Sequence, residues 1–203
     1  HRLSHEQDRG TRITPYRRSE GGVSEPPRAV RVEVVARPGV PQLLSQEECR
    51  SVLATTVAAA GAPAGSTVTL TLSDDPELAA LNAEHLGVDG PTDVLSFPLL
   101  PPSAFPAHPG RDPALHEESP PFPTPPGEAP HLGDVIVSVE RALDQAEGGA
   151  GGQTSDVRWA PADELRLLIT HGGLHLCGWD HAEPEEEAAM RALERELLGM
   201  ASR

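Results

Sequence analysis

The sequence predicts a single small domain of mixed α and β structure, in which about four strands form one mixed sheet that is packed with helices. Four short segments alternate apolar with polar residues, the pattern of half-buried strands. Helix-start signals precede other stretches in which apolar residues recur three and four positions apart. Aromatic residues make up only 3% of the chain, so the core must rest on Leu, Val, Ala and Ile. The 203 residues suffice for one domain with some length to spare.

The strands are expected where the alternation is clearest. AVRVEVVA and STVTLTLS alternate along their length and are rich in residues branched at Cβ, which favour strands. The proline of DVLSFPL, Pro98, cannot donate a hydrogen bond to a neighbouring strand, so this strand is expected at an edge of the sheet. The four expected strands are Ala29–Ala36, Ser66–Ser73, Asp93–Leu99 and Gly133–Val139.

The helices are expected where capping signals meet apolar periodicity. Ser45 followed three residues later by Glu48 is a capping-box pattern, which predicts a helix that runs to about Ala60. Pro161 is typical of a first helical turn, and the helix that it opens continues into a group of histidines. The other helices are expected at about Asp74–Asn82, Glu140–Glu147 and Pro184–Leu198.

Two segments fall outside this domain. Residues 1–27 are polar and show neither helical nor strand periodicity, so they are interpreted as a disordered arm, with an Arg-bearing arm that touches RNA as the alternative. Residues 101–130 are dense in proline and are interpreted as a flexible insertion. Residues 28–100 and 131–203 would then form the one domain.

Composition excludes some classes of protein and constrains others. No run of about 18 or more apolar residues exists, so no membrane span is expected. The N-terminus lacks the pattern of a secretory signal, and two cysteines are too few for a disulfide framework, so a cytoplasmic location is expected. All 16 basic residues are Arg, yet the net charge is −15. Any RNA would therefore have to bind in a local groove, because the overall field repels phosphates.

The strongest functional pattern is the string HGGLHLCGWDH, which contains three histidines. His171 and His175 are four residues apart, so on a helix they project from one face, roughly 6 Å apart along the axis. Gly178 can adopt a left-handed conformation that ends the helix and turns the chain back, bringing His181 to the same point. Three histidines around one metal ion leave a fourth position free, as in catalytic zinc sites.

The residues beside these histidines refine this interpretation. Gly172 and Gly173 each cost roughly 1 kcal/mol inside a helix, which indicates a close approach of another element there. Cys177 is either a fourth ligand or a buried structural thiol, and the second reading is favoured because its position faces away from the histidine side. Zinc peptidases with the same histidine spacing carry Glu directly after the first histidine as general base. Gly172 occupies that position here, which argues against proteolysis.

HGGLHLCGWDH resembles the signature of the YbeY family of metal-dependent endoribonucleases. LNAEHLGVDGPTDVLSFP, LGDVIVSVERALDQA and the helix with Met190, Glu194 and Leu197 agree with the family too, so the resemblance covers most of residues 29–100 and 131–200. It implies an α+β, zincin-like domain with one zinc ion in a cleft. It also implies cleavage of single-stranded RNA, maturation of the 3′ end of small-subunit ribosomal RNA, and ribosome quality control. The implied partners are ribosomal RNA and the small ribosomal subunit, with neither DNA nor a membrane.

Carried over position by position, the resemblance makes His171, His175 and His181 the zinc ligands. His171 and Asp180 are the candidate catalytic residues. Asp180 would either orient a ligand histidine or accept a proton, and the first role is favoured. The strand from Asp93 to Phe97 would form a wall of the cleft.

The sequence departs from the family pattern at two places. The family typically has an Arg at the position of Leu86, and such an Arg would fix a phosphate group. His85, next to it, is either a substitute donor or an ordinary surface histidine, and Trp179 stands where Tyr is usual. The loss of the Arg leaves an alternative open, in which the protein is a non-catalytic, metal-binding ribosome assembly factor.

Overall fold

A computed structural model describes three ranges of the chain, residues 29–109, 129–148 and 159–199. The predicted arm, residues 1–27, and most of the predicted insertion lie outside these ranges. The first nine residues of that insertion, 101–109, lie inside them and include a short 3-10 helix, η1, at Pro102–Ala104.

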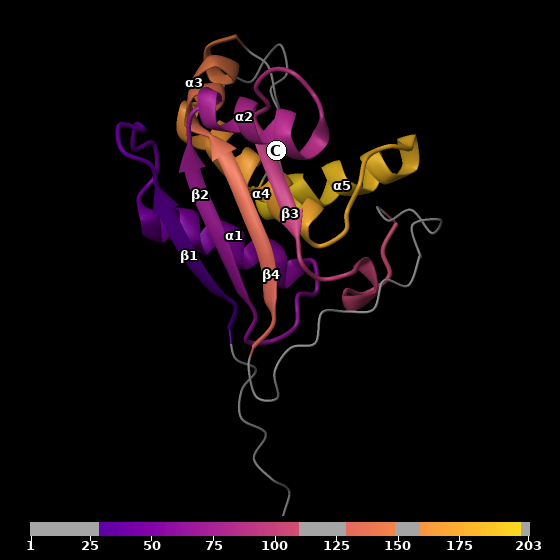
Figure 1. The fold of residues 1–203 in the computed structure, drawn as a ribbon. Coiled ribbons are helices and arrows are strands. Elements are labelled where there is room, and N and C mark those ends of the chain that lie inside the picture. Colours follow the sequence, from indigo (N-terminus) through magenta and orange to yellow (C-terminus); the bar gives the residue numbers. More distant parts are fainter. Residues whose placement is uncertain (1–28, 110–128, 149–158, 200–203) are drawn as a thin grey trace, which may run out of the picture.

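The strands form one mixed sheet, as the sequence predicts (Figure 1). Their order is β1-β2-β4-β3, in which β1, β2 and β4 run parallel and β3 pairs antiparallel with β4. β3, which contains Pro98, is an edge strand, so the edge position inferred from this proline is confirmed. The strands span Arg31–Ala36 (β1), Thr67–Ser73 (β2), Val94–Pro98 (β3) and His131–Ser138 (β4).

The helices lie mainly behind one face of this sheet. Figure 1 shows α1 and α4 behind the strands, and α2 and α3 at the end of the sheet where β2 and β4 finish. α1 packs on β1 and α4, and α4 packs on β3 and β4. The helices span Gln46–Ala59 (α1), Asp75–Leu86 (α2), Val139–Gly148 (α3), Pro161–Leu176 (α4) and Pro184–Leu197 (α5). Among the described residues, no helix combines the length and apolar character needed to cross a membrane.

Local capping explains where these helices begin and end. The side chain of Ser45 accepts a hydrogen bond from the backbone N–H of Glu48, whose carboxylate accepts one from the backbone N–H of Ser45, so the predicted capping box is confirmed. α2 continues to Leu86, past the predicted end near Asn82, and stops where Gly87 adopts a left-handed φ of 66°. The exposed turn between those points contains good helix formers and lacks the apolar period that marks a helix in sequence.

The core lies between the sheet and the pair α1 and α4. Val68, Leu70 and Val135 are among the residues that the strands contribute, and Leu53 and Ile169 come from the two helices. Aliphatic side chains dominate this core, in keeping with the low aromatic content of the sequence. One side of α4 is therefore fixed against the sheet, and the side that bears its histidines is only partly buried.

Candidate metal centre

The two glycines of α4 hold this helix close to its neighbours. A Cβ atom at Gly172 would lie 2.6 Å from Cγ1 of Val135 and 2.7 Å from Cγ2 of Val94. A Cβ atom at Gly173 would lie 2.8 Å from Cδ1 of Leu53. The close approach inferred from these glycines is confirmed, and it places the end of α4 tightly between the sheet and α1.

A tight turn then ends α4. Gly178 has a φ of 81°, which favours glycine, as the sequence predicts. Its N–H donates to the carbonyl of His175 at 3.0 Å, and the N–H of Trp179 donates to the carbonyl of Leu174 at 3.1 Å. These two bonds form a Schellman motif. The chain consequently turns back, and the residues after Trp179 return toward the end of the helix.

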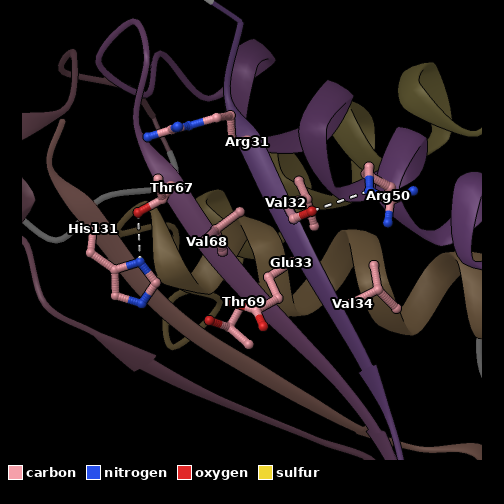
Figure 2. Close-up of a pocket in the computed structure, with 9 residues that line it drawn as sticks. All are labelled: Arg31, Val32, Glu33, Val34, Arg50, Thr67, Val68, Thr69 and His131. Atoms are coloured by element: carbon pink, nitrogen blue, oxygen red, sulfur yellow. Dashed lines mark hydrogen bonds between the residues drawn. The ribbon is translucent and has the colours of Figure 1, made fainter.

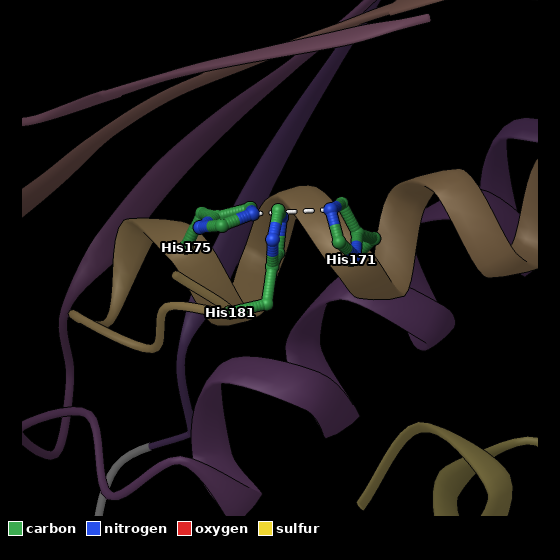
Figure 3. A group of neighbouring side chains, drawn as sticks. All are labelled: His171, His175 and His181. Atoms are coloured by element: carbon green, nitrogen blue, oxygen red, sulfur yellow. Dashed lines mark hydrogen bonds between the residues drawn. The ribbon is translucent and has the colours of Figure 1, made fainter. Parts of the chain in front are cut away.

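This turn brings the three predicted histidines together (Figure 3). Their candidate ligand atoms all lie within 4.8 Å of one another. The Nε2 atoms of His171 and His175 are 3.0 Å apart. A zinc ion bonded to two imidazoles at about 2.0–2.1 Å in tetrahedral geometry sets their nitrogens about 3.3 Å apart. The histidines of α4 therefore have nearly the spacing that such an ion needs.

Hydrogen bonds on the other side of each ring fix which nitrogen is free to bind. Nδ1 of His175 lies 2.9 Å from the carbonyl oxygen of Trp179, which can only accept, so this nitrogen carries the proton. Nδ1 of His171 lies 2.7 Å from Oε1 of Glu194, and an ionised carboxylate likewise only accepts. Both Nε2 atoms then present lone pairs to each other, which is unfavourable unless a cation lies between them. The donor set thus fits a metal ion.

Burial keeps His175 neutral, as a metal ligand must be. Desolvation, with a smaller contribution from the nearby His171 and His181, lowers the pKa of His175 to about 4. A neutral imidazole keeps its lone pair at neutral pH, so no proton has to leave this ring before a cation binds. His181 is exposed, at the outer edge of the group.

The remaining candidates near the turn take different positions. Oδ1 of Asp180 accepts a hydrogen bond from the backbone N–H of His181 at 2.7 Å. The carboxylate of Asp180 thus contacts the backbone of the predicted ligand His181. Among the described residues, no hydrogen bond joins this carboxylate to a histidine ring. Cys177 is fully buried, desolvation raises its pKa to about 12, and it is not part of the histidine group. The structural-thiol reading of Cys177 agrees with this burial.

Three contacts at the centre were not predicted from the sequence. They are the carboxylate of Glu194 on His171, the carbonyl of Trp179 on His175, and the ring of His108, which stacks on the indole of Trp179. Glu194 had a detectable signal, because it lies four residues after the buried Met190 on the inward face of α5. His108 had none, since its surroundings lack helical or strand periodicity.

The position where the family typically has Arg, and the histidine next to it, lie at the end of α2. Leu86, the last residue of α2, is 61% exposed. The ring of His85 makes an edge contact with Phe97 of β3 at 5.1 Å between centroids. β3 also contacts the helix of the centre, because the hydroxyl of Ser96 donates to the carbonyl of Gly172 at 2.8 Å.

A pocket lies elsewhere on the sheet. Its volume is about 540 Å³, and it lies at the beginnings of β1, β2 and β4. Figure 2 shows its lining residues, Arg31 and Arg50 among them. It contains none of the three clustered histidines, and His131 within it is hydrogen-bonded to Thr67. The histidine group offers three candidate ligand atoms within 4.8 Å of one another, so it is the better candidate for the active site.

Comparison with known proteins adds a consistent result. A family model described as Endoribonuclease YbeY matches residues 38–202. The Endoribonuclease YbeY of Dehalococcoides mccartyi strain CBDB1 is 32% identical over 165 residues, which cover 81% of this chain and 89% of that protein. The Endoribonuclease YbeY of Symbiobacterium thermophilum is 37% identical over 155 residues, covering 75% and 84%. That of Mycobacterium sp. strain KMS is 36% identical over 157 residues, covering 76% and 75%.

Proposed function

The chain belongs to the YbeY family of endoribonucleases, and from this premise we propose that it cleaves single-stranded RNA with one zinc ion bound by His171, His175 and His181. We further propose that its substrate is ribosomal RNA of the small subunit, whose 3′ end it matures, and that it acts in ribosome quality control. The observation that carries the proposal is the convergence of three imidazoles within 4.8 Å.

The composition of the site favours a hydrolytic use of the metal. Among the described residues, the group holds three histidines without a fourth His, Cys, Asp or Glu. Structural zinc sites are usually closed by four protein ligands, and catalytic ones keep a position for water or substrate. A zinc ion held here supplies Lewis acidity, which polarises a phosphoryl oxygen and makes water a stronger nucleophile near neutral pH.

The surrounding residues would prepare the ligands for this role. Glu194 and the carbonyl of Trp179 each hold an Nδ1 atom, so the Nε2 atoms of His171 and His175 point inward. Asp180 would act as a positioning residue, because its carboxylate accepts a hydrogen bond from the backbone N–H of His181 and so restrains the turn. His171 would take part in catalysis by binding the metal ion.

Proteolysis is disfavoured by the surroundings of Gly172. A side chain at this position would start within 2.6 Å of Val135 and 2.7 Å of Val94. A glutamate placed directly after the first histidine, as in zinc peptidases, would therefore meet the sheet. The chain has no room for that general base.

Charge shapes how RNA would bind. The described residues contain seven arginines against 22 acidic residues, so they carry the whole net charge of −15. Five of the seven are ion-paired with carboxylates: Arg37, Arg50, Arg141, Arg166 and Arg191. RNA would thus gain few phosphate contacts from this part of the chain, and the metal centre would provide much of the attraction.

Cleavage of single-stranded RNA by the purified chain tests the proposal. We expect cleavage that disappears with a chelator, returns with zinc, and is lost in His175→Ala. His131→Ala is the matched control, since this histidine lies on β4 and pairs with Thr67 away from the centre. Cleavage that survives both chelation and His175→Ala would rule out the metal mechanism. Mapping of the 3′ ends made from a small-subunit ribosomal RNA precursor tests the proposed substrate.

A second candidate function is a non-catalytic, metal-binding ribosome assembly factor. The observation that favours it is Leu86, which is exposed at the position where the family typically has Arg. On this reading the wild-type chain binds zinc and the small ribosomal subunit but does not cleave RNA. The same assay separates the two functions, because only the first predicts zinc-dependent products.

A further inference from the structure

Residues 101–109 pack against the turn that follows α4. A Cβ atom at Gly178 would lie 3.4 Å from Cβ of Pro102, which is ordinary contact at the edge of close packing. Phe105, 5% exposed, anchors the segment in the core. The ring of His108 is stacked on the indole of Trp179, with 4.0 Å between centroids and 7° between planes. The segment therefore lies beside Gly178 and contacts the turn at Trp179.

Trp179 links this segment to the histidine group. Its backbone carbonyl accepts the hydrogen bond from Nδ1 of His175, which orients that ring. Its side chain is 9% exposed, and its Nε1 has no hydrogen-bond partner among the described residues. The hydrogen bond from its backbone N–H to the carbonyl of Leu174 holds the backbone of Trp179, and packing, which includes the parallel contact with His108, positions the indole.

We propose that His108 is a positioning residue of the metal centre. By stacking on Trp179 it holds the carbonyl that fixes the tautomer and the direction of His175. The inference rests on the proposed function, in that it takes the three histidines to bind a metal ion. It assigns a role to a side chain from the proline-dense segment, which contains none of the motifs quoted from the sequence.

The stacking geometry gives an expected size for the effect. Stacking of two aromatic rings stabilises their relative position. Loss of the hydrogen-bond partner of a metal-binding histidine typically lowers metal affinity 10- to 100-fold. His108 acts one contact further out, through Trp179. We therefore expect His108→Ala to weaken zinc binding by roughly 3- to 10-fold.

The test measures the zinc dissociation constant of the purified full chain by competition with a chromophoric chelator. His108→Ala is compared with the wild type, with His108→Phe, which keeps a flat ring, and with His131→Ala as the control histidine. Should His108→Ala unfold without metal, His108→Leu replaces it, because leucine fills the space without a stacking ring. A second readout is the fluorescence of Trp179 in a Trp159→Phe background, since the chain has two tryptophans.

The outcomes separate this inference from the proposed metal site. Support consists of weaker binding in His108→Ala or His108→Leu, near wild-type binding in His108→Phe and His131→Ala, and altered Trp179 emission in the alanine variant. Unchanged binding in the alanine or leucine variant, or an equal loss in His108→Phe, overturns the role of stacking. A wild type that binds no zinc overturns the metal site itself, and the role of His108 with it.

Discussion

The Nδ1 atom of His171 lies 2.7 Å from Oε1 of Glu194, so α5 contributes a carboxylate to a centre whose predicted ligands all lie on α4 and the turn after it. Glu194 is 8% exposed. Burial of a carboxylate is costly unless hydrogen bonds compensate for it, and the imidazole N–H of His171 supplies such a bond. The contact joins the packing of α5 on α4 to the orientation of a ligand.

Removal of this carboxylate should weaken metal binding without destroying the fold. We expect Glu194→Ala to raise the zinc dissociation constant by about 10- to 100-fold, because the ring of His171 loses the acceptor that orients it. Glu194→Gln keeps an oxygen acceptor and should lose less. Glu196→Ala, on the exposed side of α5, is the control. Equal affinities of Glu194→Ala and Glu196→Ala would show that the contact does not tune the site.

The metal-free protein should lose stability in mildly acidic solution because of His175. Burial lowers the pKa of this side chain from 6.5 to about 4, so below pH 6.5 the unfolded chain binds a proton that the folded chain does not. The free energy of unfolding should therefore fall as the pH falls from 6.5 to 4, by about 3 kcal/mol in total. Urea denaturation of the metal-free chain at pH 7, 6 and 5 measures this dependence.

A variant without the titrating ring provides the comparison for this pH dependence. His175→Gln fills similar space and has no proton to gain in this range, so its unfolding free energy should change less between pH 7 and 5. The slopes are compared, since the absolute stabilities of the two chains will differ. A wild-type slope in His175→Gln would assign the acid sensitivity to other groups.

Patterns that are local in the sequence predicted both the elements and the histidine group. Ser45 and Glu48 are three residues apart, and their reciprocal bonds need no other part of the chain. Gly178 likewise needs only its own left-handed φ to bring His181 back toward His175. The edge position of Pro98 follows from its missing N–H. Each of these features depends on backbone geometry that a few neighbouring residues determine.

Contacts between distant segments were beyond such reasoning. Glu194 could be placed on the inward face of α5 by its spacing from Met190, but its contact with His171 depends on how α5 packs on α4. His108 lies in a segment interpreted as flexible, and only the fold brings it onto Trp179. The end of α2 at Leu86 was missed for a different reason, since an exposed turn leaves no apolar signal.

Gly172 should be intolerant of a methyl group although alanine is the better helix former. In Gly172→Ala the new Cβ would lie 2.6 Å from Val135 and 2.7 Å from Val94, whose branched side chains have little freedom to move. We expect a net loss of about 1–3 kcal/mol in unfolding free energy, measured by urea denaturation. Gly148→Ala, whose Cβ would meet nothing within 4 Å, should be stabilising instead. Destabilisation of both chains to the same degree would contradict the packing argument.

Restoration of an Arg at the end of α2 tests whether the departure from the family pattern limits catalysis. Leu86 is 61% exposed, so Leu86→Arg should change stability by no more than about 0.5 kcal/mol. If α2 faces the bound RNA, the guanidinium would supply the phosphate contact that the pattern implies, and the rate of RNA cleavage should rise on the order of 10- to 100-fold. Cleavage of a labelled single-stranded RNA under kcat/KM conditions measures this change.

Two comparisons give the Leu86→Arg result its meaning. Leu86→Gln makes the position polar without a charge, so an equal gain there would reflect the loss of an exposed apolar side chain. Zinc affinity should be the same in all three chains, because the substitution lies away from the three histidines in sequence and on another helix. A phosphate contact also makes RNA binding more sensitive to salt, with a slope steeper by about 0.7 for each phosphate neutralised on a single strand. Faster cleavage with an unchanged salt slope would therefore mean that Arg at this position acts on the chemical step without neutralising a phosphate of the bound RNA. If neither the cleavage rate nor the salt slope changes, cleavage by this chain does not depend on a cation at the end of α2.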